Sequence, residues 1–308
     1  MNGILVIDKP AGKTSYDVVR EVKRILGAKK AGHTGTLDPL ATGVLPICLN
    51  EATKLAQFFS SDSKDYRATM LLGVRTDTLD TEGVIISRET PQVGPGEIEA
   101  ALRGLVGKGE QIPPRYSAVK FRGKPLYQWA RKGIDVELSP RAMEIHRLAV
   151  EEVRLPYVTF TVSCSKGTYI RTICSDAGET LGCGACLSGL RRTRSGAFRE
   201  EEALPLHDRD SGTLAGHIIP MADVLPDIVN IGIDSPLAEK LKAGYQPLVA
   251  DVLGMNHIPS LAAGDMIKFV TLDRRLLAVA KMIYASDQLS ARDGKEPAVR
   301  IARVFDDE

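Results

Sequence analysis

The stretch that decides the fold and the chemistry of this chain is Gly32-His-Thr-Gly-Thr-Leu-Asp38-Pro-Leu-Ala-Thr-Gly43-Val-Leu-Pro46, which carries one carboxylate. Its glycines give the backbone the freedom that a tight, closely approached loop requires. Pro39 restricts the backbone after the acid and biases Asp38 away from helical conformation. An Asp-Pro turn between two elements would also explain part of this pattern. A single carboxylate on so constrained a loop suits a positioned nucleophile better than a solvated charge.

Further motifs occur in a fixed order around this loop. They are Gly3-Ile-Leu-Val-Ile-Asp-Lys-Pro-Ala-Gly-Lys-Thr-Ser15, Lys64-Asp-Tyr66 with Gly73-Val-Arg-Thr-Asp-Thr78, Lys166-Gly-Thr-Tyr-Ile-Arg-Thr172, and Leu190-Arg-Arg192. Together with the Asp38 loop, which meets the pattern G-H-T-G-x-L-D-P-x-A-x-G-x-L-P throughout, this series resembles the TruB family of tRNA pseudouridine synthases. The resemblance covers residues 3–195, and such an ordered series is very rare by chance.

The resemblance implies an enzyme, an isomerase that converts uridine to pseudouridine at position 55 in the T-loop of tRNA. The N-glycosidic bond breaks, the uracil rotates, and it rejoins the ribose through carbon five. This chemistry needs a nucleophile, a cavity for a flipped-out base and exclusion of water. The family implies no cofactor and no metal, the T-stem-loop of tRNA as the partner, and a monomer.

The resemblance also assigns catalytic roles. Asp38 corresponds to the family's nucleophile, and Arg171 to the arginine that pairs with it. An acid in a mostly apolar pocket needs a nearby cation to stay ionised. Tyr66 corresponds to the tyrosine that stacks on the uracil and is considered in proton transfer. Without the resemblance, Arg171 would be interpreted as an exposed residue on a first helical turn, and Tyr66 as core.

Four more residues are implied in substrate binding. Tyr169 corresponds to the second tyrosine of the pocket, and Leu190 to the residue that closes the pocket floor. His33 corresponds to the histidine that packs against the reorganised RNA loop. Lys9, followed by Pro10, is expected to buttress the active-site loop.

Composition restricts the class of protein. A chain of 308 residues can hold one large domain and a small one, and 44% hydrophobic residues argue against disordered and fibrous proteins. There is no apolar run of about 18 residues and no signal segment at the first residues, so the sequence predicts no membrane span and a cytoplasmic location. Five cysteines fit a reducing compartment.

The net charge of +1 hides an uneven distribution of cations. Two stretches, at 115–132 and 191–199, carry Lys and Arg with no acid, and the N-terminal region is rich in lysine. Clustered cations contact phosphates, although a charge run is also typical of a solvated face. Beside the motif series, these clusters favour RNA contact. The stretch 115–132 is further predicted to be a mobile insertion that clamps the RNA.

Hydrophobic patterns predict an α+β fold. Strands are expected at 4–7, 44–49, 66–72 and 158–164, and helices at 15–27, 51–60, 98–106 and from 167 onward. Strands and helices are interspersed without strict alternation. The fold class is therefore expected to be a mixed, mainly antiparallel sheet flanked by helices, as in a pseudouridine-synthase catalytic domain.

The C-terminal region is predicted to be a separate small domain. Residues 205–226 are interpreted as a connector, followed by a helix at 235–244 and strands at 264–270 and 276–280. These features resemble the PUA-type β domain of the family, which gives a catalytic domain at 1–226 and a PUA-like RNA-contacting domain at 227–308. Residues 228–308 carry ten Lys/Arg and eleven Asp/Glu, which argues against strong independent RNA binding there.

Three other interpretations account for parts of the sequence. Gly12-Lys-Thr14 is similar to part of a phosphate-binding loop, but Ile7 stands where that motif needs glycine. Cys183-Gly-Ala-Cys186 has the spacing of half a zinc site without a second pair. The third is a non-catalytic RNA-binding or tRNA-folding protein of the same fold, which could lose its nucleophile. The presence of Asp38 favours catalysis.

Overall fold

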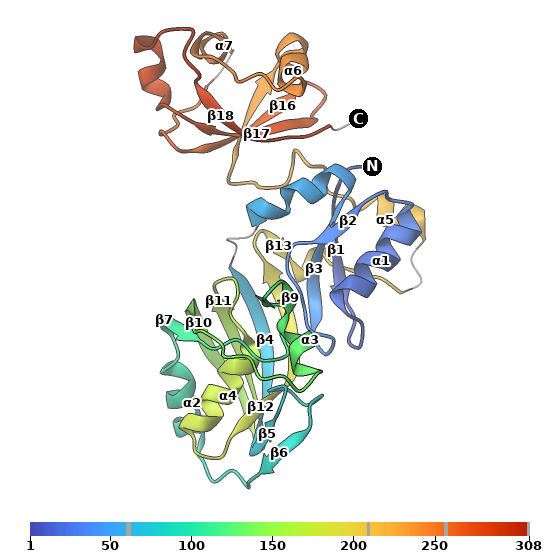
Figure 1. The fold of residues 1–308 in the computed structure, drawn as a ribbon, viewed down its shortest axis with the longest axis vertical. Coiled ribbons are helices and arrows are strands. Elements are labelled where there is room, and N and C mark those ends of the chain that lie inside the picture. Colours follow the sequence, from blue (N-terminus) through green and yellow to red (C-terminus); the bar gives the residue numbers. More distant parts are fainter. Residues whose placement is uncertain (60–62, 208–209, 256–257, 307–308) are drawn as a thin grey trace.

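The structure is a computed structural model that describes residues 1–59, 63–207, 210–255 and 258–306. Figure 1 shows an elongated molecule in which a large sheet with helices fills one end and a smaller sheet, formed by the last quarter of the chain, fills the other. Among the described residues, no helix is long and apolar enough to cross a membrane.

The large sheet has ten strands and is mainly antiparallel. The order along its main path is β14-β1-β3-β12-β4-β11-β10-β7, with β13 paired to β12 and β2 paired to β3. Only the pairings of β1 with β14 and of β3 with β12 are parallel among the described residues. The expected α+β fold with a mixed, mainly antiparallel sheet is confirmed. The strands are β1 (Gly3–Lys9), β2 (Ala31–His33), β3 (Thr42–Leu49), β4 (Lys64–Leu72), β7 (Gly107–Gln111), β10 (Arg141–Arg154), β11 (Tyr157–Cys164), β12 (Ala185–Ser195), β13 (Phe198–Arg199) and β14 (Leu204–Pro205).

Two helices pack on this sheet next to the site. Helix α1 (Ser15–Leu26) begins with a capping box between Thr14 and Asp17 and ends before Gly27, which has the left-handed conformation, so the helix predicted at 15–27 is confirmed to within one residue. Helix α4 (Ile170–Thr180) buries Ile170, Ile173, Cys174 and Ala177 against the large sheet, where its nearest strands are β12 and β4. The two helices bring the chain segments that carry the site to one region of the sheet.

Two predicted helices differ from those observed. The helix expected at 98–106 is α2 (Pro95–Arg103), because Gly94 and Pro95 provide its start and Gly104 follows its end. The helix expected at 51–60 is the 3₁₀ helix η1 (Asn50–Phe59). Its last predicted residue, Ser60, lies outside the described residues.

Short elements fill the remaining connections. They are β5 (Val74–Thr76), β6 (Ile85–Arg88), β8 (Lys120–Phe121), β9 (Lys124–Pro125), α3 (Leu126–Ala130), η2 (Glu200–Glu202) and α5 (Ser211–Ala215). The expected connector at 205–226 contains α5 and buries apolar side chains, including Leu214 and Met221. It therefore packs as part of the core instead of crossing open solvent.

The C-terminal sheet has the order β15-β16-β17-β18, and β15 and β16 are parallel. Val270, Leu276, Val279 and Phe305 from this part share one hydrophobic cluster with residues of β1, β3 and η1, such as Ile4. The shared cluster joins the small sheet to the large one. The elements are β15 (Val229–Ile233), α6 (Ser235–Lys242), α7 (Val249–Leu253), β16 (Met266–Thr271), β17 (Leu276–Met282), η3 (Ser286–Ala291) and β18 (Val299–Val304).

Candidate active site

The loop that carries Asp38 is held by buried hydrogen bonds from both sides. The Oγ of Ser15, the first residue of α1, accepts from the Leu37 amide at 2.8 Å and donates to the Leu37 carbonyl at 3.0 Å. The Lys9 ammonium, at the end of β1, donates to the carbonyls of Pro39 at 3.1 Å and Ala41 at 2.6 Å. These contacts fix the backbone on each side of Asp38.

Gly43 closes the same loop at a position that excludes any side chain. Its φ is +98°, and an added Cβ would lie 2.2 Å from the backbone oxygen of Arg192. The side chain of Arg192, fully buried, donates from Nε to the Val44 carbonyl at 2.7 Å and from Nη2 to the Gly35 carbonyl at 3.1 Å. Strand β12 therefore braces the Asp38 loop through Arg192.

Lys9 supports the loop and does not line a cavity around Asp38. It is fully buried, and burial lowers its pKa to about 8 although the nearby Asp38 opposes this shift. Its contacts agree with the expected buttressing role. Direct substrate contact by Lys9 has no support in this arrangement.

Asp38 is paired with Arg171 from the first turn of α4. The Arg171 Nη2 donates to Asp38 Oδ1 at 3.2 Å, and Nε lies 2.9 Å from Oδ2 without the alignment of a hydrogen bond. Arg171 is only 3% exposed, so it is not the surface residue that its helical position alone suggested. It is held further by the carbonyls of Thr78 and Tyr116, both at 2.9 Å, and by Asp80 at 3.7 Å.

Burial and the charge of Arg171 shift the pKa of the Asp38 carboxyl in opposite directions. Desolvation raises the pKa of its carboxyl, and the neighbouring Asp80 raises it further. The Arg171 guanidinium lowers it. The side chain keeps 32% of its surface open to the cavities beside it, so a substrate can reach the carboxylate that Arg171 helps to keep ionised.

A cavity of about 440 Å³, here called the inner chamber, lies on one side of Asp38. Its walls include Tyr66 from β4, Tyr169 before α4 and Leu190 from β12, together with Arg171. Tyr66 is buried, and desolvation raises the pKa of its hydroxyl while the adjacent Arg192 opposes that shift. The inner chamber offers two aromatic side chains, Leu190 and several basic side chains next to one carboxylate.

A second cavity, of about 610 Å³ and here called the outer chamber, meets the inner one at Asp38. It is lined by His33 and Tyr16 from the N-terminal segments and by Tyr127 and Arg131 from the insertion at 115–132. Burial lowers the pKa of His33, and its Nδ1 has no protein partner within the described part of the chain. The outer chamber thus holds aromatic, basic and acidic side chains, the last including Asp80 and Glu82.

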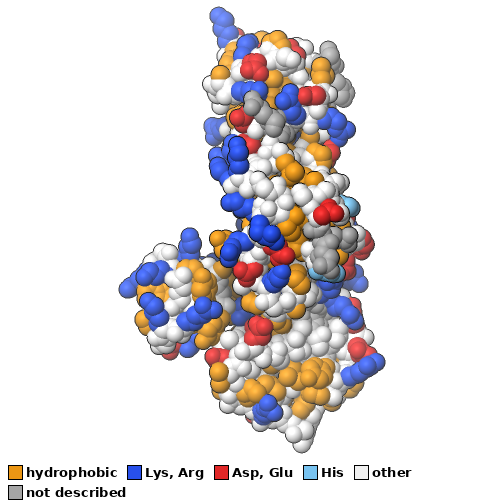
Figure 2. Space-filling model, turned by 90° about the vertical axis from the view of Figure 1, so that its right-hand side faces the viewer, with side chains coloured by type: hydrophobic (Ala, Val, Ile, Leu, Met, Phe, Trp, Pro, Cys, Tyr) orange, Lys and Arg blue, Asp and Glu red, His pale blue; other side chains and the backbone are white. Residues whose placement is uncertain are grey.

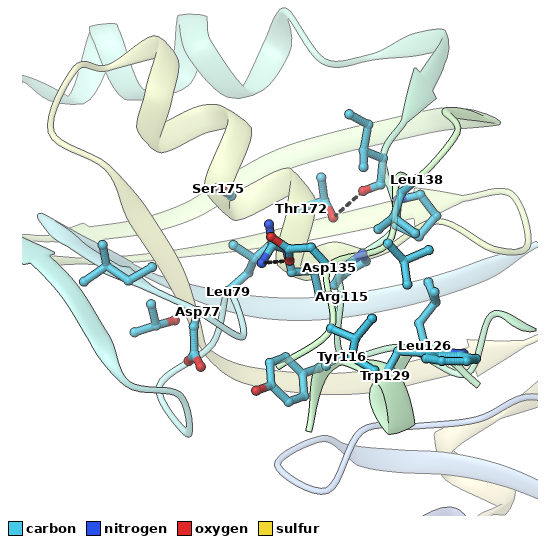
Figure 3. A pocket seen from close by; sticks show the side chains of 18 of the residues that line it. Asp77, Leu79, Arg115, Tyr116, Leu126, Trp129, Asp135, Leu138, Thr172 and Ser175 are labelled. Atoms are coloured by element: carbon cyan, nitrogen blue, oxygen red, sulfur yellow. Dashed lines mark hydrogen bonds and ion pairs between the residues drawn. The ribbon is translucent and has the colours of Figure 1, made fainter. Parts of the chain in front are cut away.

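A third cavity, of about 660 Å³, lies on another side of α4 and is shown in Figure 3. Leu126 and Trp129 border it from α3, and an ion pair of 2.5 Å between Arg115 and Asp135 crosses it. Thr172, next to the catalytic candidate Arg171, donates to the Ile112 carbonyl at 3.5 Å there. The segment that leads into the insertion therefore contacts α4 beside Arg171, and Tyr116 within the insertion binds Arg171 itself.

The structure brings together most residues predicted from the sequence. Asp38, Tyr66, Tyr169, Arg171 and Leu190 all line the inner chamber, and His33 lines the outer one. Sequence reasoning missed the parts played by three buried residues around the site: Asp80, Ser117 and Arg192. Ser117 lies in the basic stretch 115–132, which was predicted to contact RNA as a mobile insertion, and no role was predicted for Arg192 in the motif Leu190-Arg-Arg192.

Comparisons with known proteins identify the family of this chain. A family model described as TruB family pseudouridylate synthase (N terminal domain) matches residues 23–170, and one described as tRNA pseudouridylate synthase B C-terminal domain matches residues 171–221. A curated relative, tRNA pseudouridine synthase B of Syntrophus aciditrophicus (strain SB), is 57% identical over 311 residues, covering 100% of this chain and 99% of the relative. The protein of the same name from Clostridium tetani is 45% identical over 275 residues, 89% of this chain and 93% of the relative.

Solved structures share the fold over 99% of this chain. A chain of a Cbf5-Nop10-Gar1 complex is 30% identical with a TM-score of 0.73, and 85% of that chain is covered. A chain of an archaeal box H/ACA sRNP Nop10-Cbf5 complex is 28% identical with a TM-score of 0.71 and 86% coverage.

The sheet, the aspartate loop and these matches define a pseudouridylate synthase, an isomerase of uridine in RNA. Within that class, the chain belongs to the TruB family. Its reaction is the isomerisation of uridine to pseudouridine in tRNA.

Proposed function

We propose that this chain isomerises the T-loop uridine at position 55 of tRNA, with Asp38 as the nucleophile. The observation that carries the proposal is the Asp38–Arg171 pair, which lies where two chambers meet, one of them with two tyrosines and room for a flipped base. A carboxylate that stays ionised beside such a chamber is suited to attack or to stabilise positive charge as the glycosidic bond breaks.

The other residues of the inner chamber have roles that follow from their chemistry. Tyr66 and Tyr169 provide the flat surfaces on which a flipped uracil stacks. Leu190 closes the floor and excludes water, which protects the detached base from release. The hydroxyl of Tyr66 is also the candidate group for proton transfer at carbon five.

Recognition of the T-stem-loop rests on shape and charge. His33 lines the outer chamber, where the RNA loop would lie next to the target nucleotide. The insertion at 115–132 contributes Arg131 to the same chamber and is proposed to clamp the RNA. Figure 2 shows a projecting lobe whose charged side chains are mostly Lys and Arg. Equal proteolysis of the insertion with and without tRNA would contradict the clamp.

We also propose the domain organisation and the oligomeric state of the protein. Residues 1–226 form the pseudouridine synthase catalytic domain, and residues 227–308 a PUA-like domain that contacts RNA. The protein is proposed to act as a monomer in the cytoplasm, without a cofactor. Sedimentation of the protein alone and with tRNA tests the monomer.

Release of tritium from carbon five tests the proposed function. A tRNA transcript labelled with tritium at carbon five of uridine loses the label to water when the base rejoins through that carbon. Wild type should release it from the T-loop uridine only, and Asp38→Asn should be slower by at least about a thousandfold. Tight tRNA binding without release by wild type would instead support a tRNA-folding protein.

A further inference from the structure

Ser117 holds a buried hydroxyl that the proposed mechanism does not use. The residue is 5% exposed, and its Oγ has no hydrogen-bond partner among the described residues. Buried hydroxyls are almost always paired, since an unpaired one has lost its water without compensation. An orphan of this kind next to a catalytic carboxylate indicates a group that finds its partner only when substrate is bound.

The backbone around Ser117 is fixed, so its hydroxyl cannot simply turn away with the chain. The Ser117 carbonyl accepts from the Tyr127 amide at 3.2 Å. The carbonyl of the preceding residue, Tyr116, accepts from the Arg171 guanidinium at 2.9 Å. The segment is therefore anchored to the same arginine that pairs with Asp38.

Ser117 lies at the junction of the two chambers. Only a few residues line both cavities: Thr36, Leu37, Asp38, Ser117, Ala118 and Arg171. The inner chamber, with its two tyrosines, suits the base, and the outer chamber, which opens from the same carboxylate, has room for the neighbouring nucleotide. The sugar that connects base to backbone must then pass through the junction, beside Asp38 and Ser117.

We infer that the Ser117 hydroxyl hydrogen-bonds the 2′-hydroxyl of the target ribose. This inference rests on the proposed function and deepens it, because it assigns the residue that recognises the target ribose. The 2′-hydroxyl is adjacent to the carbon whose bond to the base breaks, and it can donate and accept, as the serine hydroxyl can. Ser117 thus gives the site a means to distinguish RNA from DNA at the reacting nucleotide.

A binding cycle with two changes tests the contact. All proteins carry Asp38→Asn to prevent turnover, with or without Ser117→Ala, and bind a T-stem-loop with either uridine or 2′-deoxyuridine at the target. With Ser117 present, the deoxy change should weaken binding roughly fivefold. With Ser117→Ala, binding of the ribo form should weaken by a similar factor and the deoxy change should cost nothing more. If the deoxy change and Ser117→Ala each weaken binding and the two factors multiply when combined, the inference is overturned.

Thermal unfolding separates this role from a structural one. Ser117→Ala should keep or raise Tm, because the hydroxyl has no partner in the free protein. Ser15→Ala is the matched control, since the Ser15 hydroxyl is also buried but makes two hydrogen bonds to Leu37, and it should lower Tm. A lower Tm with unchanged binding for Ser117→Ala would contradict the inference. If wild type releases no tritium, the proposed function is wrong. If wild type is active but Ser117→Ala and the deoxy change weaken binding independently, only the role of Ser117 is wrong.

Discussion

Arg171 and Asp38, 133 residues apart in the chain, meet with the guanidinium Nε 2.9 Å from the carboxylate Oδ2. The arginine side chain is almost fully buried, and its second carboxylate neighbour, Asp80, is buried as well. Removal of a buried partner leaves the remaining charges uncompensated, which costs more than the pair itself contributes. The pair therefore couples the stability of the site to its chemistry.

Arg171→Met should lower both stability and activity. The variant leaves Asp38 and Asp80 without their cation, and we expect a loss of about 3–5 kcal/mol in the free energy of unfolding. Denaturant unfolding measures this loss, and tritium release measures the accompanying loss of activity. Arg67→Met is the control, because Arg67 pairs with Glu151 on the surface, and its loss should change neither quantity noticeably. Equal stability of the two variants would contradict the coupling.

The pH profile should report the environment of Asp38. Burial raises the pKa of its carboxyl, and the reaction needs the ionised form, so activity should fall as the pH drops through a value above the usual carboxyl pKa of about 4. Arg171 lowers that pKa, and the residual activity of Arg171→Met should therefore fall off at a higher pH than that of wild type. Profiles of kcat/KM between pH 4 and 9 measure both. An identical acid limb in the two proteins would show that Asp38 does not control it.

Gly43→Ala should disrupt the catalytic loop. The backbone at Gly43 has a positive φ, and a methyl group there would collide with the backbone of Arg192, so we expect a loss of roughly 3 kcal/mol in unfolding free energy. Gly32→Ala is the matched change on strand β2, just before the loop, because a Cβ at Gly32 meets nothing within 4 Å. Thermal unfolding and tRNA isomerisation by both variants test the difference. Comparable effects would mean that the close approach to β12 is unimportant.

Lys9→Met should loosen the Asp38 loop, because Lys9 holds its backbone. The buried carbonyls of Pro39 and Ala41 would lose their donor, at about 1–3 kcal/mol for each one left unpaired. The pKa of Lys9, lowered to about 8, also makes the stability of the folded protein depend on pH. The unfolded chain binds more protons than the folded one between pH 8 and the ordinary lysine pKa, so wild type should gain stability relative to Lys9→Met across that range. Unfolding curves at pH 7 to 10.5 measure it, and a constant difference would contradict the lowered pKa.

The sequence predicted the parts of the site that local patterns encode. The sequence pattern predicted a strand at 66–72 with Tyr66 on a sheet face and a helix at 15–27, which are β4 and α1. The Gly-rich loop around Asp38 was recognised from its residues and from the family pattern. These features depend on neighbours within a few positions, which a sequence displays directly.

Contacts between distant segments could not be predicted in this way. The bracing of the loop by Arg192 depends on the parallel pairing of β3 and β12, which lie almost 150 residues apart in the chain. Ser117 stands in a stretch without strong periodicity, and its burial follows only from the packing of the insertion against α4. Helix α2 was misplaced because apolar residues through Val106 were weighted above the start signal at Pro95, and Val106 is in fact exposed.

Phe305→Ala should show whether the two sheets unfold together. The Phe305 ring is fully buried in the cluster that the C-terminal sheet shares with β1, β3 and η1. Its truncation should cost about 3–5 kcal/mol, and because the cluster belongs to both parts, one cooperative transition should move to lower temperature. Leu272→Ala is the control, since Leu272 is 90% exposed and its loss should leave Tm nearly unchanged. Calorimetry measures both variants. A separate early transition in Phe305→Ala, with isomerase activity retained above it, would mean that the C-terminal part folds independently and that the shared cluster does not support the Asp38 loop.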